Sequence, residues 1–204
     1  MIVTGIATVT KKKCKVELDG QLAFVLYKGE LARYRLRVGE ELKEEQYEEI
    51  MTEVLLKRAK RYLLHLLTKM DRTTYELETK LKRGDYPEEV IAGAITYVTS
   101  YGYLNDQHYA EKYLHTYEER LSLRQIKWKL AAKGISKEIL DSLSDVRVEN
   151  NESELIGAHI IKRTKGKEKL DDKEIKRLAD YLYRKGFEGD MIWAALKKYQ
   201  SKDD

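Results

Sequence analysis

The alternation of apolar and polar residues at the start of the chain predicts β-strands. Residues 2–9 and 14–27 show the two-residue period of strands with one buried face. Asp19-Gly20 interrupts the second run, and this dipeptide is typical of a tight two-residue hairpin turn. The alternating apolar positions around that turn, expected on one face of a sheet, are Val16, Leu18, Leu22, Phe24 and Leu26.

The pattern changes to that of helices near residue 40. A helix is expected to begin near residues 40–43, and no strand pattern follows it. The chain has a single proline, Pro87, and its glycines stand at intervals, as expected of helices separated by short turns.

Within the helical part, one spacing of apolar residues recurs. Counted from Leu77, positions 0, 4, 9, 13 and 14 are apolar or aromatic, and the same holds 49 and then a further 52 residues along the chain. A period of roughly 50 residues indicates repeated helical units, none of which can bury its apolar face alone. The positions are Leu77, Leu81, Tyr86, Val90, Ile91; Ile126, Leu130, Ile135, Ile139, Leu140; Leu178, Leu182, Phe187, Met191 and Ile192.

Each unit contains a predicted helix stop. Gly134 and Gly186 stand where a residue of left-handed conformation would end a helix, and an apolar residue follows each, as in a Schellman motif. The corresponding residue of the first unit is Asp85, beside Gly84. Because aspartate tolerates that conformation less well than glycine, the turn there is expected to be shifted by one residue.

Helix starts also repeat. Capping boxes are predicted at 73–76 and 122–125, and a third, about one turn earlier in its unit, at 171–174. Another amphipathic helix is expected ahead of each box, at 58–70, 106–120 and 153–163.

The predicted fold is mainly α: an elongated, curved tandem array of three three-helix repeats with a small N-terminal β-hairpin region. The expected parts are a hairpin region at 1–42, a connecting helix at 43–58, and repeats at 59–99, 100–148 and 149–204.

Charge is spread evenly along the chain. Charged residues make up 36% of the sequence, yet the net charge is only +4. Divided after residues 58, 99 and 148, every segment has one more basic than acidic residue. Any electrostatic specialisation must therefore lie in faces and short clusters.

Several features favour a cytoplasmic protein. Cys14 is the only cysteine, which excludes an internal disulfide and suits a reducing compartment. No stretch is apolar for the ~20 residues that span a bilayer. The first residues place apolar side chains before lysines, which is the wrong order for a signal peptide.

The stretch YGYLND, residues 101–106, raises the question of an active site, since Asn105 and Asp106 are followed by His108 and His115. Asn and Asp are favoured as helix caps, and two histidines without a cysteine make a poor metal site, so a helix start is the preferred interpretation. The phosphate-binding, dinucleotide-binding and metalloprotease motifs are absent as well. No catalytic residue, metal or cofactor is expected, and the sequence favours binding.

A basic strip is the main candidate for that binding. Between residues 120 and 137 there are six basic residues and no acidic one, and Trp128 lies nearly opposite the apolar face of its helix. Two interpretations stay open: a docking strip for phosphates or an acidic protein surface, or a tryptophan packed against a neighbouring repeat within a solvated face. The candidate binding residues are Arg120, Arg124, Lys127, Trp128, Lys129 and Lys133.

Smaller basic clusters lie on predicted turns and are expected to be secondary. They comprise Lys11, Lys12 and Lys13, and Lys162, Arg163, Lys165 and Lys167. A helix-turn-helix reader of DNA is disfavoured, because the helices that follow the glycine turns are poor in basic and amide side chains.

The repeats contain four short motifs: YEL at 75–77, GYLND at 102–106, LRQI at 123–126 and KGI at 133–135. Together they indicate a protein family more specifically than any one of them does alone. In this combination the chain resembles the RecX family of bacterial regulatory proteins. The resemblance covers about residues 43–200 and is strongest over 59–143.

The resemblance implies a function. RecX proteins modulate the recombinase RecA in recombination, DNA repair and the SOS response. They bind in the groove of the RecA filament on single-stranded DNA and limit its growth and its ATPase, strand-exchange and coprotease activities. They have no catalytic residues or cofactor, and some also bind DNA. The expected protein is a monomeric, non-enzymatic regulator; the competing hypothesis is a stand-alone module that binds single- or double-stranded DNA through phosphate contacts.

Overall fold

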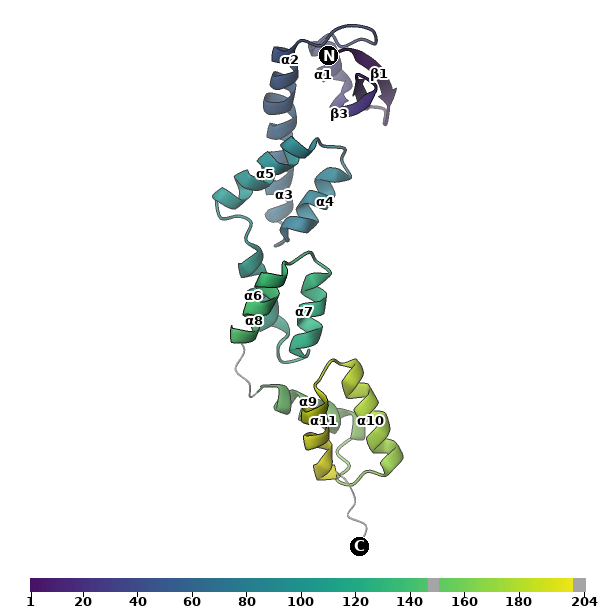
Figure 1. The fold of residues 1–204 in the computed structure, drawn as a ribbon, viewed down its shortest axis with the longest axis vertical. Coiled ribbons are helices and arrows are strands. Elements are labelled where there is room, and N and C mark those ends of the chain that lie inside the picture. The colour runs from purple at the N-terminus through teal and green to yellow at the C-terminus, as the bar shows by residue number, and fades with distance from the viewer. Residues whose placement is uncertain (147–150, 200–204) are drawn as a thin grey trace. The chain divides into compact units, whose positions relative to one another are not determined.

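The computed structural model describes residues 1–146 and 151–199 (Figure 1). The chain divides into two compact units, 1–105 and 106–204. The expected boundary between the second and third repeats, at 148/149, lies outside the described residues.

The first unit opens with an antiparallel sheet of three strands in the order β1-β2-β3: Val3–Thr8, Lys13–Leu18 and Gln21–Tyr27. Asp19 and Gly20 join β2 to β3, and both have positive φ (49° and 83°), as a type I′ turn requires. The predicted hairpin turn is therefore confirmed.

The prediction that Leu22 lies on the same face of the sheet as Phe24 is wrong. Val16 pairs with Phe24 but Glu17 pairs with Leu22, so the register shifts between them. Such a β-bulge interrupts the alternation of side chains. As a result Leu22 is 47% exposed, whereas Phe24 is fully buried.

Helices complete the first unit. A short helix that the apolar pattern did not predict, α1 (Lys28–Arg33), follows β3 directly. The helix expected near residues 40–43 begins at α2 (Glu44–Glu49) and runs on through a π-helical stretch, η1 (Ile50–Leu56), into α3 (Lys57–Leu67). Two further helices follow: α4 (Thr74–Lys82) and α5 (Glu88–Ser100).

One apolar core joins the sheet to the first three-helix repeat, with Val16 and Phe24 in the same cluster as Leu77. Polar contacts reinforce this packing. Arg58 of α3 donates a hydrogen bond of 3.1 Å to the carbonyl of Val25 and forms an ion pair with Glu30. The N-terminal sheet is thus part of the first unit's core.

The second unit contains two three-helix repeats. Its helices are α6 (Asp106–Tyr117), α7 (Leu123–Ala131), α8 (Lys137–Val146), α9 (Asn151–Thr164), α10 (Asp172–Arg184) and α11 (Gly189–Leu196), with a final 3₁₀ turn η2 (Lys197–Tyr199). Each repeat buries an apolar cluster of its own.

The periodic positions have the expected role, because none of the fifteen is exposed. The three helix stops are also equivalent: Asp85, Gly134 and Gly186 all have positive φ (53°, 79° and 80°). In each turn the next residue donates a hydrogen bond of 3.2–3.3 Å to the carbonyl five residues earlier, as in a Schellman motif.

The shift expected at Asp85 is therefore wrong, since aspartate itself adopts the left-handed conformation. A neighbour explains why Gly84 stands beside it: a Cβ on Gly84 would lie 3.0 Å from the ring of Tyr86. Asp85 also forms a 3.0 Å ion pair with Lys15 of β2, a contact that glycine does not offer.

Candidate partner-binding surface

Helix α7 carries the central part of the predicted strip, between Arg120 and Lys133, and presents its tryptophan outward. Ile126 and Leu130 are fully buried, whereas Trp128 is 70% exposed. Residues two apart lie on nearly opposite sides of an α-helix, because one turn takes 3.6 residues. The expected orientation of Trp128, away from its own core, is confirmed.

The basic residues of the strip differ in exposure. Arg124 and Lys129 are exposed, while Lys127 and Lys133 are partly buried. The Lys133 ammonium lies 5.6 Å from the centre of the Tyr109 ring, within the range of a cation–π contact. On α7 itself, the side chains most available to another molecule are therefore those of Trp128, Arg124 and Lys129.

The start of α7 docks onto the third repeat. Ser122 is fully buried; its hydroxyl accepts a hydrogen bond from the amide of Gln125 (3.2 Å) and donates one of 2.6 Å to the carbonyl of Lys185. The predicted capping box is only half formed, because the Gln125 side chain lies 3.5 Å from the carbonyl of Arg184. The amide of Leu123 is bound by Glu152 of α9 (3.0 Å).

The approach at this junction leaves no room for a side chain on Gly186. A Cβ there would lie 2.8 Å from the Ser122 hydroxyl and 3.4 Å from the Cβ of Arg124. Arg124 therefore sits beside the turn of the third repeat, next to Arg184 and Lys185. The sequence shows a glycine at the repeated helix stop. It does not predict that this glycine contacts Ser122 and Arg124.

Arg120 is brought to the third repeat as well. It lines a hollow of about 300 Å³ with Glu119 of its own repeat and His159 and Lys162 of α9, among others. The pKa of His159 is lowered, mainly by burial and then by the positive charges of Lys185 and Lys162. Its Nδ1 lies 3.0 Å from the hydroxyl of Tyr181. The structure thus unites two basic clusters that are 42 positions apart in the sequence.

The N-terminal cluster belongs to the first unit. Lys11 and Lys12 are exposed on the turn between β1 and β2. Lys13 begins β2, and its ammonium lies 5.3 Å from the centre of the Tyr27 ring. These lysines form a small basic edge on the sheet.

The remaining cluster surrounds the end of α9. Lys162 and Arg163 lie in its last turn, and Lys165 and Lys167 on the loop that follows. Lys167 forms an ion pair of 2.7 Å with Glu174; this hydrogen bond raises the pKa of Lys167 and lowers that of Glu174. Arg177 of α10 lines a second hollow together with Arg163, Lys165 and Lys167, and it was not among the predicted residues.

The stretch at 101–106 is a turn and a helix start. Gly102 has a φ of 73°, and α6 begins at Asp106. His108 and His115 do share a face, where they line a shallow hollow with Glu111. Among the residues that the structure describes, no three His, Cys, Asp or Glu side chains gather closely enough to hold a metal ion.

Two comparisons with known sequences decide the family. Models of the first and third three-helix domains of RecX match residues 59–97 and 151–196. The regulatory protein RecX of Caldanaerobacter subterraneus subsp. tengcongensis is 31% identical over 198 residues, covering 96% of this chain and 98% of the relative. The chain belongs to the RecX family. The regulatory protein RecX of Bacillus subtilis is 32% identical over 212 residues, which cover 99% of this chain and 78% of that protein.

Solved structures share this fold. A crystal structure of regulatory protein RecX has a TM-score of 0.65 at 25% identity, covering 96% of this chain and 98% of that one. RecX from Lactobacillus salivarius has a TM-score of 0.63 at 23% identity over 71% of this chain, which supports the fold. Across the described ranges, no helix is long and apolar enough to cross a membrane.

Proposed function

We propose that this RecX-family protein is a non-enzymatic regulator of homologous recombination and DNA repair. It binds the RecA filament on single-stranded DNA in the cytoplasm and inhibits its activities. The observation that carries the proposal is family membership over nearly the whole chain, with relatives named regulatory proteins.

The exposed face of α7 is the proposed contact. Trp128 is large and solvent-exposed, and Arg124 and Lys129 lie on the same short helix. Tryptophan and arginine are enriched among the residues that dominate the energy of protein interfaces. The junction at Ser122 holds this helix against the third repeat, so the face is presented with little conformational freedom.

RecA ATPase activity on single-stranded DNA tests the proposal when this protein is titrated as a monomer at substoichiometric ratios. The expected result is a fall in ATPase well below one molecule per recombinase, at concentrations where bare single-stranded DNA is not bound. Loss of ATPase only when the DNA itself is coated would instead favour a stand-alone nucleic-acid-binding module, with the steep salt dependence of phosphate contacts.

A further inference from the structure

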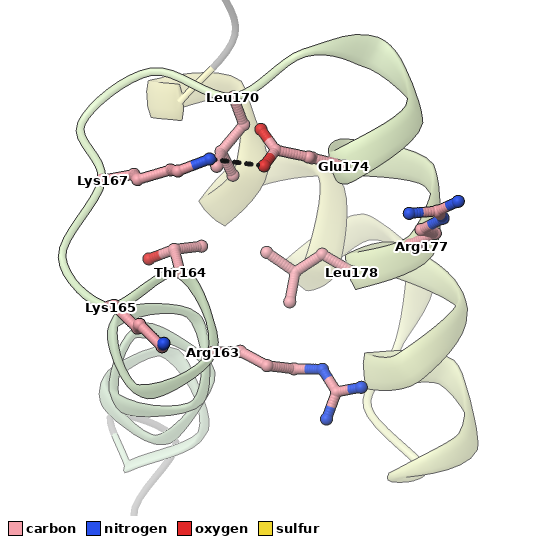
Figure 2. A pocket seen from close by; sticks show the side chains of 8 residues that line it. All are labelled: Arg163, Thr164, Lys165, Lys167, Leu170, Glu174, Arg177 and Leu178. Atoms are coloured by element: carbon pink, nitrogen blue, oxygen red, sulfur yellow. Dashed lines mark hydrogen bonds and ion pairs between the residues drawn. The ribbon is translucent and has the colours of Figure 1, made fainter.

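The third repeat contains a hollow of about 290 Å³ between the end of α9, the following loop and α10 (Figure 2). It is lined by Arg163, Thr164, Lys165, Lys167, Leu170, Glu174, Arg177 and Leu178.

The rim of this hollow is positively charged. Within the described part of the chain, neither Lys165 nor Arg177 forms an ion pair, and both are exposed. The guanidinium of Arg163 lies 4.1 Å from the centre of the Tyr181 ring, so it is held in place without being neutralised. Only Lys167 is paired, to Glu174, which offsets one positive charge with one negative charge.

The floor is apolar. Leu170 and Leu178 belong to the buried core of the third repeat, and Leu178 points toward the centre of the hollow in Figure 2. Cofactor and drug-sized ligand sites run from about 300 to 1,000 Å³, so this hollow lies at their lower limit. Its size suits one or two side chains of a partner.

We propose that this hollow is a docking site for an acidic peptide segment of a partner protein, with one apolar side chain of that segment seated against Leu178. Charge complementarity favours acidic residues on both sides of the apolar one, because three cations that form no ion pair with any residue the structure describes, Arg163, Lys165 and Arg177, line the hollow. An apolar anchor inserted in a pocket with a charged rim is a common arrangement at protein interfaces.

Nucleic acid fits the hollow less well. Sites for single-stranded nucleic acid combine a basic track with aromatic side chains on which bases stack. No aromatic residue lines this hollow, and the Glu174 carboxylate forms part of its wall. This docking site deepens the proposed function, because it names the chemistry of the partner surface. It rests on the proposed function in one respect: that function identifies the protein that supplies the acidic segment.

Methyl NMR of the full chain tests the proposal through the signals of Leu170 and Leu178. The probe is a blocked heptapeptide of six acidic residues around a central leucine. A second peptide has serine in place of that leucine, and a thymidine oligonucleotide of twelve bases represents nucleic acid. The pocket variant is Arg163→Glu with Arg177→Glu. Its matched control, Lys173→Glu with Lys176→Glu, makes the same charge change at exposed positions of α10 outside the hollow.

The leucine peptide is expected to shift both leucine signals and to bind the pocket variant about tenfold more weakly, with less than about a threefold loss in the control. Equal binding of the serine peptide, equal losses in the two variants, or stronger shifts with the oligonucleotide would each overturn the proposal. The assay contains no recombinase, so its failure leaves the ATPase test of the proposed function unaffected.

Discussion

The hydroxyl of Ser122 donates a hydrogen bond of 2.6 Å to the carbonyl of Lys185, 63 residues further along the chain. The same hydroxyl caps α7 by accepting from the amide of Gln125. One buried side chain therefore starts a helix of the second repeat and holds the helix-ending turn of the third.

Ser122→Ala is expected to destabilise the second unit by about 2–4 kcal/mol. The loss of a helix cap costs about 1 kcal/mol, and the partly buried carbonyl of Lys185 left without this partner costs about 1–3 kcal/mol. Urea unfolding followed by tryptophan fluorescence measures this unit, because both tryptophans, Trp128 and Trp193, lie in it. Ser136→Ala, which removes a solvent-exposed hydroxyl near the amide of Ile139, is the matched control and should cost less than about 1 kcal/mol. Equal losses in the two variants would contradict the double role of Ser122.

Gly186→Ala is expected to destabilise the protein more than Gly166→Ala. Both glycines have a φ near +80°, so alanine is strained at each by about 1–2 kcal/mol. A Cβ at position 166 meets open space, whereas one at 186 would lie 2.8 Å from the Ser122 hydroxyl. Urea unfolding should show about 1–2 kcal/mol more loss for Gly186→Ala, consistent with overpacking. Indistinguishable variants would mean that the repeats do not meet at this turn.

Asp85→Gly is expected to leave the stability of the first unit nearly unchanged. Glycine relieves the left-handed strain at this position, which offsets the loss of the partly exposed ion pair with Lys15, worth about 0–1 kcal/mol. Asp85→Val should cost about 2–3 kcal/mol, since a β-branched residue is strongly disfavoured at positive φ. Thermal unfolding followed by circular dichroism compares the stability of the two variants. Equal stability of the valine and glycine variants would contradict left-handed strain at this position.

The periodic apolar positions were sufficient to predict three helix pairs and the turns at Gly134 and Gly186, because helix faces and Schellman stops depend on local sequence. The errors arose where tertiary contacts override local preference. Asp85 keeps a strained conformation beside Lys15, a bulge turns Leu22 outward, and the Gln125 side chain contacts the third repeat in place of its own cap.

The candidate site was predictable only in part. The helical period placed Trp128 outside the core, since that follows from one helix alone. No local pattern could bring Arg120 to His159 and Lys162, or add Arg177 to the cluster after α9, because these contacts depend on how separate helices pack.

Stability of the second unit is expected to fall in mild acid because of His159. Burial first, and then the charges of Lys185 and Lys162, lower its pKa in the folded state. The unfolded chain, with a pKa of about 6.5, therefore takes up the proton more readily. This contribution is fully present above about pH 6.5 and is lost as the pH falls through that value toward the lowered pKa.

Urea midpoints between about pH 7.5 and 5.5 should decline more steeply for the unchanged protein than for His159→Gln. His115→Gln removes a solvent-exposed histidine of the same unit and should retain the steep decline. Parallel curves for the unchanged protein and His159→Gln would refute a role for this residue.

We propose that the outer face of α7 binds the recombinase filament. The most direct test compares, between two folded double variants, the concentration of protein that halves RecA ATPase activity on single-stranded DNA. Trp128→Ala with Lys129→Glu alters the face, and Trp193→Ala with Lys197→Glu makes the same changes at exposed positions of the third repeat. The first variant is expected to require at least about tenfold more protein, whereas the second is expected to match the unchanged chain. Equal potency of all three would contradict it.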